Sequence, residues 1–311
     1  MKEQRYPPKN IAVIVNPVTG GGSARRVWPE IARLLAGFGM EFTCDFTDKP
    51  GAGTELAKRA LHRGCDCVVA AGGDGTVNEV VNGLLAEGGP AKARLGIIPC
   101  GSGRDLARTL GIPRSPADAV ALLAAGRTRL VDVGRIDFRT EDGGSAGRYF
   151  LNIADAGLGG ETANRVNRMG KKAGGFLSFL LGALVTVFTY RSKQVTISFN
   201  GGPPEPVDLT TIAMANGKYF AGGMMIAPHA KMDDGVFDLI TVYEMKRFEL
   251  LLNLYLVYSG RHIRHPKVTV RRGSRVFIDA KEQVYIEADG EVIGFLPAEF
   301  TVLPEVLSVI C

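Results

Sequence analysis

The strongest constraint on the fold is one stretch, residues 65–82, in which an apolar run leads through a glycine-rich turn into a helical pattern. The run at residues 68–71 has the length of a buried strand, and apolar residues recur at helical spacing after Thr76. The turn at residues 72–75 (GGDG) presents backbone N–H groups at the start of a helix, where a phosphate is stabilised. Asp74 would repel that phosphate unless a metal ion or an attacking hydroxyl lay between them. The turn therefore predicts phosphoryl transfer.

Strands and helices alternate from the N-terminus to about residue 130. The predicted strands cover residues 11–15, 41–46, 68–71 and 95–98, and the predicted helices cover 27–38, 53–63, 77–85 and 116–125. Apolar strands joined by short connections to helices are typical of a doubly wound parallel sheet, in which ligands bind at the carboxyl ends of the strands.

The pattern changes after about residue 131, where alternating strands and turns predict an antiparallel β-sandwich with helices at 173–190 and 249–258. We therefore predict an α/β domain over residues 1–134, completed by residues 300–311, and a β-sandwich domain over residues 135–299 that binds the substrate. Exposed strand edges in the second domain are compatible with a homodimer.

Composition sets broad limits on location and partners. The net charge of +5 fits phosphates or an anionic membrane surface, and we expect no nucleic-acid partner. Residues 1–10 carry no apolar signal segment, and the five cysteines lack paired spacing, with Cys65 and Cys67 predicted as reduced thiols on one face of a strand. We expect a cytoplasmic protein. The uncharged segment 173–190 fits a buried helix, an interfacial helix that would place the protein at the inner face of the membrane, or a membrane span.

Three further turns have the composition of ligand-binding loops. Residues 16–23 (NPVTGGGS) follow the first strand, where Ser23 could cap the next helix, although neither a Walker A loop nor a dinucleotide fingerprint is present. In residues 99–105 (PCGSGRD), the glycines leave the backbone N–H groups accessible to a phosphate. Asp105 fits a helix N-cap, as Thr76 does after the turn at residues 72–75. Residues 287–292 (EADGEV) read as a hairpin whose tip could bring carboxylates to a nucleotide.

In this order, the four turns resemble the diacylglycerol kinase catalytic family, in particular the soluble bacterial lipid kinases, over about residues 10–303. The resemblance implies ATP as phosphate donor, Mg²⁺ as cofactor and a lipid as acceptor, with the nucleotide between the two domains. The implied nucleotide-binding residues are Asn16, Pro17, Val18, Thr19, Gly20, Thr47, Gly72, Gly73, Asp74, Gly75, Thr76, Val77, Asn78, Glu79, Gly101 and Ser102.

The resemblance also implies catalytic and metal-binding roles. Glu291 matches the family's general base, Asp289 would support it, and Asp74 would bind catalytic Mg²⁺ or orient the hydroxyl. Residues 231–236 (KMDDGV) resemble the family's structural Mg²⁺ loop, with the Lys231 and Val236 carbonyls and the Asp234 carboxylate as ligands. A charged β-turn is the alternative interpretation of this loop.

One position departs from the family pattern: Arg104 stands where the family has asparagine, which changes the charge near the phosphates. Two other functions stay open. An NAD kinase-like enzyme would share the GGDGT turn, and a nucleotide- or lipid-sensing module without turnover would account for Arg104.

Overall fold

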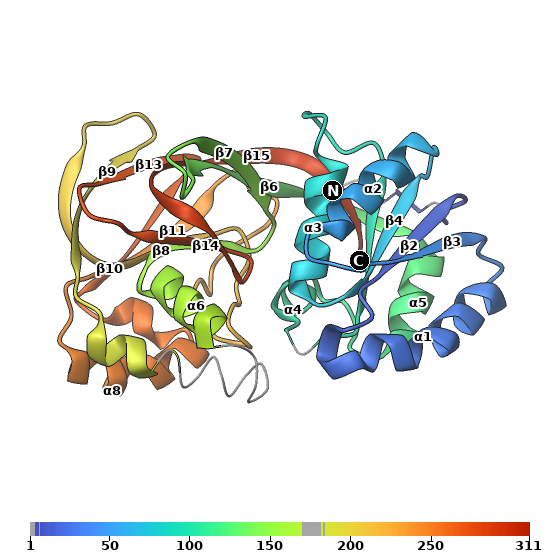
Figure 1. Cartoon of the computed structure of the whole chain (residues 1–311), viewed down its shortest axis with the longest axis horizontal. Coiled ribbons are helices and arrows are strands. Elements are labelled where there is room, and N and C mark those ends of the chain that lie inside the picture. The colour runs from blue at the N-terminus through green and yellow to red at the C-terminus, as the bar shows by residue number, and fades with distance from the viewer. Residues whose placement is uncertain (1–3, 6, 102, 170–181, 183) are drawn as a thin grey trace. The chain divides into compact units, whose positions relative to one another are not determined.

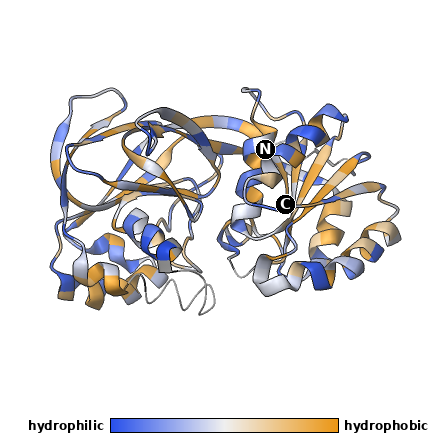
Figure 2. Cartoon of the chain, viewed as in Figure 1, coloured by the Kyte–Doolittle hydropathy of each residue, from blue (hydrophilic) through white to orange (hydrophobic). Residues whose placement is uncertain are grey.

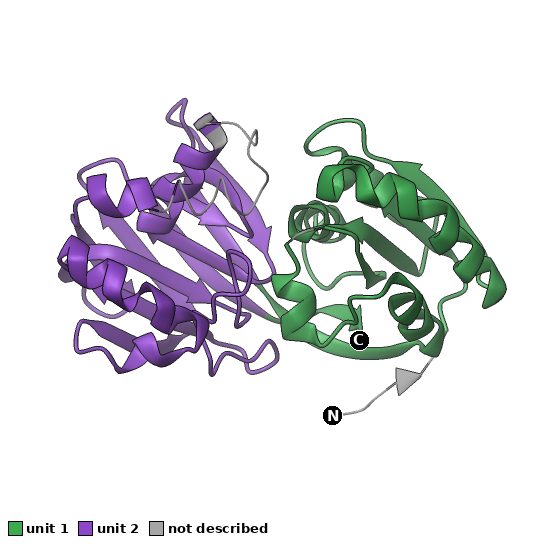
Figure 3. Cartoon of the chain, turned by 90° about the horizontal axis from the view of Figure 1, so that it is seen from below, with its two compact units in different colours: residues 1–133, 304–311 green, residues 134–303 purple. Residues whose placement is uncertain are grey.

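The computed structural model describes residues 4–5, 7–101, 103–169, 182 and 184–311. The chain forms two compact units, one of residues 1–133 with 304–311 and one of residues 134–303 (Figure 3). Of the predicted helix at 173–190, only residues 182 and 184–190 lie in the described part. Among the described residues, no helix is long and apolar enough to cross a membrane.

The first unit is an α/β domain (Figure 1). Its elements are β1 (Gln4–Arg5), β2 (Ile11–Val15), α1 (Thr19–Gly37), β3 (Phe42–Phe46), α2 (Ala52–His62), β4 (Cys67–Gly72), α3 (Asp74–Leu84), β5 (Arg94–Pro99), α4 (Asp105–Leu110) and α5 (Pro116–Ala125). Two long strands, β6 (Arg127–Arg139) and β15 (Glu291–Ile310), have residues in both units.

The sheet of the first unit is parallel, in the order β3-β2-β4-β5-β15. Strands β2 and β4 are buried along their whole length, which explains their unbroken apolar sequences (Figure 2). The C-terminal end of β15 joins this sheet at Val309, which pairs with Leu95. The predicted parallel sheet, completed by the C-terminal segment, is confirmed.

The second unit is built mainly of antiparallel strands. Its elements are β7 (Ser145–Phe150), β8 (Ile153–Gly157), α6 (Leu158–Met169), β9 (Lys193–Phe199), β10 (Glu205–Ala215), β11 (Phe237–Tyr243), α8 (Arg247–Tyr258), η1 (Arg261–Arg264), β12 (Val268–Gly273), β13 (Arg275–Ala280) and β14 (Tyr285–Ala288). The pairings close into a ring, β8-β14-β15-β13-β9-β10, because β10 and β15 are long enough to take part on both sides. Its core includes Phe150 and Phe237, whose rings stack 5.4 Å apart.

Two local predictions were wrong. Helix α6 was not predicted, because its first turn contains Gly159 and Gly160 and most of its other residues are polar. Cys65 precedes β4 and does not alternate with Cys67 within a strand. All five cysteines are free thiols, and Cys65 and Cys67 are buried.

Candidate functional site

Four predicted binding segments lie at one edge of the first unit's sheet. Strands β3, β2, β4 and β5 are consecutive neighbours in the parallel sheet. The residues that directly follow these strands are, in the same order, Thr47, Asn16, Gly73 and Cys100. The backbone ties these ends together: the Thr47 amide donates to the Val15 carbonyl at 2.9 Å, and the Cys100 amide donates to the Gly72 carbonyl at 2.9 Å. The structure thus brings together residues that the sequence spreads over more than eighty positions.

The first turn bends sharply and contacts the other two. Gly20, Gly21 and Gly22 have φ angles of 61, 66 and 85°, a left-handed conformation that favours glycine. The Asn16 side-chain amide donates to the Thr76 hydroxyl at 3.2 Å. Ser23 directly follows these non-helical glycines, and its hydroxyl donates to the Cys100 carbonyl at 2.9 Å in place of the predicted helix cap.

The second turn starts helix α3 with its backbone N–H groups uncovered by a capping side chain. The N-cap is Gly73, and no side-chain cap hydrogen bond forms in this described segment. Thr76 is the third residue of the helix, so its predicted capping role was wrong. The Asp74 carboxylate accepts a hydrogen bond from the Asp105 amide at 3.2 Å. The turn is therefore a helix N-terminus suited to an anion, with a carboxylate at its first position.

The third turn explains the departure at Arg104. The Arg104 Nε donates to the Gly101 carbonyl at 2.8 Å, so the guanidinium closes its own turn. Asp105 is the first residue of α4 and not its N-cap, and its buried carboxylate pairs with Arg108 at 2.9 Å. The predicted contact at Ser102 lies outside the described residues.

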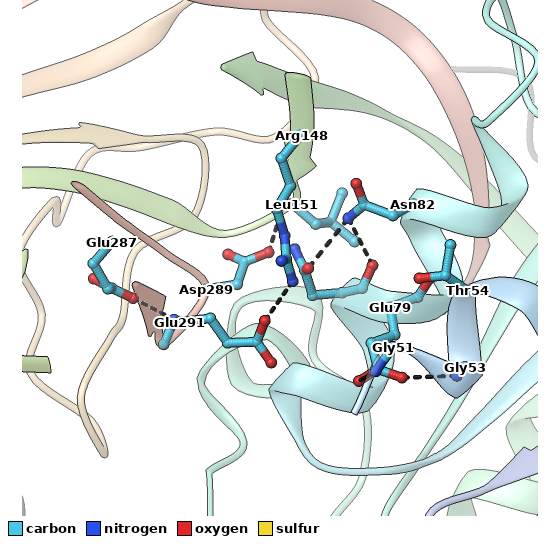
Figure 4. Close-up of polar contacts among 12 residues, drawn as sticks. Gly51, Gly53, Thr54, Glu79, Asn82, Arg148, Leu151, Glu287, Asp289 and Glu291 are labelled. Carbon is cyan, nitrogen blue, oxygen red and sulfur yellow. Dashed lines mark hydrogen bonds and ion pairs between the residues drawn. The ribbon is translucent and has the colours of Figure 1, made fainter. Parts of the chain in front are cut away.

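The side chains that follow the second turn have structural contacts. Val77 and Asn78 are buried in α3, and Asn82 donates to the Asn78 carbonyl at 2.9 Å. The Glu79 carboxylate accepts hydrogen bonds from the Gly51 and Gly53 amides, both at 2.8 Å, at the start of α2 (Figure 4). The structure therefore supports a packing role for these side chains. Their predicted contact with a nucleotide stays a prediction.

In the second unit, the predicted hairpin joins β14 to β15 through Asp289 and Gly290, whose φ angles are 48 and 93°. The Asp289 carboxylate accepts a hydrogen bond from the Leu151 amide at 2.8 Å (Figure 4). It also accepts hydrogen bonds from the amides of Asn152 and Ile153 at 3.0 and 3.1 Å. Three backbone donors fix the hairpin tip against the start of β8 and the two residues before it. This arrangement supports a positioning role for Asp289.

Glu291 is the first residue of β15, and its carboxylate lies 2.5 Å from the Arg148 guanidinium (Figure 4). Its side chain is 41% exposed. A partly exposed carboxylate held by a guanidinium keeps lone pairs that can accept a hydrogen bond from an approaching hydroxyl group. The contact between Arg148 and Glu291 was not predicted, because the two residues lie far apart in the chain.

A second pair of acids lies at the base of the same hairpin. Asp155 and Glu287 are cross-strand neighbours on β8 and β14, and they are 2% and 7% exposed. The Gly160 amide donates to Asp155 and the Gly290 amide donates to Glu287, whereas Oδ2 of Asp155 is buried without a partner in the described part of the chain. A proton shared by the two carboxyl groups would supply that partner. The only sequence signal for this pair was an acid within the apolar run 153–157.

Burial raises the pKa of Asp155 to about 6, and burial together with the charge of Asp155 raises the pKa of Glu287 well above its usual range. A raised pKa means that the folded state binds the proton more tightly than the unfolded state. The stability from Asp155 is therefore complete below about pH 4 and lost as the pH rises through about 6, an effect of about 3 kcal/mol.

We predict that Glu287→Gln removes most of this loss, because an uncharged amide can hydrogen-bond to an ionised Asp155. The free energy of unfolding of the variant should exceed that of the wild type by about 1–3 kcal/mol at pH 8. At pH 5 this difference should be smaller. Urea unfolding at both pH values measures the effect. Glu244→Gln, at an exposed position of the same unit, should leave the pH dependence unchanged. If stability falls equally in E287Q and in the wild type between pH 5 and pH 8, Asp155 and Glu287 do not share a proton.

The predicted metal loop shows an ion pair at its acid. The Asp234 carboxylate contacts the Arg272 guanidinium, which also lies 3.2 Å from Asp238. Oδ2 of Asp238 is buried without a partner among the described residues, and burial raises the pKa of Asp238. Carboxylate and carbonyl oxygens suit Mg²⁺, but Arg272 already neutralises Asp234, and the described residues contain no cluster of three or more acids, histidines or cysteines. Lys231, Asp234 and Val236 as ligands stay a prediction.

The second unit also contains an apolar pocket with a cavity volume of about 150 Å³. It lies between α6, α8 and strands β10 and β11, and its walls are mainly aliphatic side chains such as Ile240, Val242, Leu250 and Leu254. Asp155 is one of its few polar residues. The pocket therefore adjoins the acid pair at the base of the hairpin that carries Glu291.

Comparison with known proteins gives two matching family models. The diacylglycerol kinase catalytic domain matches residues 10–136, and the YegS C-terminal NAD kinase beta sandwich-like domain matches residues 152–311. The "Diacylglycerol kinase" of Staphylococcus carnosus (strain TM300) is 31% identical over 302 residues, which cover 97% of this chain and 94% of that protein. The chain belongs to the diacylglycerol kinase family.

Solved structures show the same fold. A Bacillus anthracis str. Sterne protein assigned as a diacylglycerol kinase covers 100% of the chain with a TM-score of 0.80 at 24% identity, and 97% of that protein is covered. An NAD kinase from Archaeoglobus fulgidus, solved in complex with ATP, covers 97% of the chain with a TM-score of 0.52 at 15% identity, and 93% of that protein is covered. The predicted family and fold class are confirmed.

Proposed function

We propose that this member of the diacylglycerol kinase family is an ATP-dependent lipid kinase, which transfers the γ-phosphate of ATP to the hydroxyl group of a lipid such as diacylglycerol. The observation that carries the lipid acceptor is the apolar pocket of the second unit. Its aliphatic walls fit an acyl chain and offer little to the polar surface of a dinucleotide. The pocket thus favours a lipid over the NAD kinase alternative.

In the proposed mechanism, the three turns of the first unit bind the ATP phosphates through backbone N–H groups at the start of α3. The Asp105 amide holds the Asp74 carboxylate in these turns, and this carboxylate would bind Mg²⁺, which would neutralise charge on the phosphates. Arg104 holds the third turn closed and so keeps the turn's shape without the family's asparagine. A structural role for Arg104 supports the kinase over a sensing module without turnover.

The acceptor would bind with its acyl chain in the apolar pocket and its hydroxyl near Glu291. The hydroxyl oxygen forms a bond to the γ-phosphorus while the bond from that phosphorus to the β–γ bridging oxygen breaks, and ADP leaves. Glu291 accepts the hydroxyl proton, and the next exchange with solvent releases it. Arg148 holds the Glu291 carboxylate, and Asp289 holds the hairpin. A nucleotide between the two domains remains part of this proposal.

The direct test incubates the full chain with γ-labelled ATP and either a total lipid extract or NAD. We expect label in a lipid product, which chromatography identifies, and none in a dinucleotide. Asp74→Asn is the test variant, because asparagine keeps an oxygen for the Asp105 amide but loses the charge. It should lower transfer at least about 10²-fold. Label in NADP alone, or no transfer by the wild type to any lipid, would contradict the proposal.

A further inference from the structure

Helix α8 is apolar on two opposite faces. Leu250, Leu254 and Val257 line the pocket on its inner face. Phe248 and Tyr255, on the outer face, are 71% and 70% exposed. The helix has no fully buried residue. A helix that is apolar all round is normally enclosed by protein or by lipid, so the outer face of α8 requires an explanation.

The exposed apolar side chains concentrate on this helix. Four of the twelve exposed large apolar residues of the described chain lie within the twelve residues of α8: Phe248, Leu252, Tyr255 and Tyr258. Spacings of four, three and three residues place them along one side of the helix. Figure 2 shows apolar residues in this lower-left part of the second unit. We call these four residues the α8 outer face.

Basic residues flank the α8 outer face at both ends. Lys246 and Arg247 precede the aromatic residues, and Arg261 and Arg264 follow in η1. All four are exposed, and none has an ion pair within the described ranges. The one acid of the helix, Glu249, is neutralised by Lys267 at 2.9 Å and faces His265 at 3.3 Å. The surface is therefore apolar at its centre and positive at both ends of a helix about 18 Å long.

We propose that the α8 outer face binds an anionic lipid bilayer, with its aromatic and leucine side chains at the level of the head groups. Aromatic and aliphatic side chains flanked by lysine and arginine are the composition of interfacial helices, and the positive ends complement the negative surface of the leaflet. The pocket behind α8 then lies directly beneath the membrane surface. This inference rests on the proposed lipid kinase function, which it deepens. Vesicle binding can nevertheless be tested separately, because it requires no turnover.

The test measures co-sedimentation of the full chain with vesicles of phosphatidylcholine alone or with one third phosphatidylglycerol, without ATP. We expect binding to the anionic vesicles that weakens in high salt. The triple variant Phe248→Ser, Leu252→Ser, Tyr255→Ser should lower the partition coefficient at least about tenfold. Arg261→Gln with Arg264→Gln should lower it for anionic vesicles only. Phe277→Ser, a change at an exposed apolar residue of β13, should leave binding unchanged.

The outcomes separate this inference from its rivals. Because the changed residues are exposed, the variants should melt like the wild type, so lost binding cannot be ascribed to unfolding. Binding of the triple variant at the wild-type level, or no binding by the wild type, would overturn the inference. The wild type could instead be a dimer that does not bind vesicles. If the triple variant is then a monomer, the α8 outer face binds a second copy of the chain. Phosphorylation of a short-chain lipid in solution should be unaffected in the triple variant, which tests the proposed function separately.

Discussion

Replacing Glu291 by glutamine should lower kcat by about 10²–10⁴-fold with little change in the KM for ATP, if Glu291 is the proton acceptor of the transfer. Glutamine has the same shape and can accept a hydrogen bond from Arg148, but it cannot take up a proton at neutral pH. The change therefore removes the proposed chemistry and leaves the contact that positions the side chain. Initial rates with labelled ATP and a lipid acceptor measure it.

Glu299→Gln is a suitable control for this variant. Glu299 lies on the same strand, β15, and its carboxylate also contacts an arginine, Arg275, so the substitution makes the same chemical change away from the hairpin. It should leave kcat within about twofold of the wild type. If E291Q retains more than a tenth of wild-type kcat while its melting curve is unchanged, Glu291 is not the proton acceptor.

The sequence predicted the phosphate-binding edge of the first unit well, because its signals are local. Short apolar runs followed by glycine-rich turns place Asn16, Asp74 and Gly101 at strand ends, and alternation with helices makes those strands parallel. Parallel neighbours then bring the ends to one edge. The error at Thr76 has the same local origin, because the helix begins at Asp74 and so leaves Thr76 inside its first turn.

The second unit was less predictable, because its contacts depend on strand register. Asp289 binds backbone amides more than 130 positions earlier in the chain, and Glu287 meets Asp155 only through the pairing of β14 with β8. A hairpin motif specifies its own turn and not the strand beside it. The apolar pocket likewise needs α6, α8 and the sheet together, and α6 was missed.

A single methyl group at Gly101 is expected to have a large effect on ATP binding. A Cβ at this position would lie 2.7 Å from the Gly73 Cα and 3.1 Å from the Gly73 amide nitrogen, which are backbone atoms that no rotamer change can move. It would also lie 3.0 Å from the Thr19 methyl group. Gly101→Ala must therefore push the third turn away from the second, and from the first as well.

Displacing the turns by even a fraction of an ångström matters if they bind one phosphate chain together. We expect Gly101→Ala to lower kcat/KM for ATP by about 10²-fold or more and to abolish the stabilisation of the protein by ATP in thermal unfolding. Its cost in stability without ATP should be about 1–3 kcal/mol, the usual range for overpacking. Circular dichroism at 25 °C, a temperature at which the variant stays folded, separates misplacement from unfolding.

Gly37→Ala provides the matched control, because Gly37 is the last residue of α1, has no positive φ, and a Cβ there would meet nothing within 4 Å. It adds the same methyl group to the same unit and should leave ATP binding unchanged. If Gly101→Ala binds ATP as well as Gly37→Ala does, the second and third turns do not share a phosphate site, and the nucleotide must be held elsewhere along the sheet edge. If Gly101→Ala loses ATP binding and Gly37→Ala keeps it, the close contact between the Gly73 and Gly101 backbones joins two separate strand ends into one phosphate-binding site.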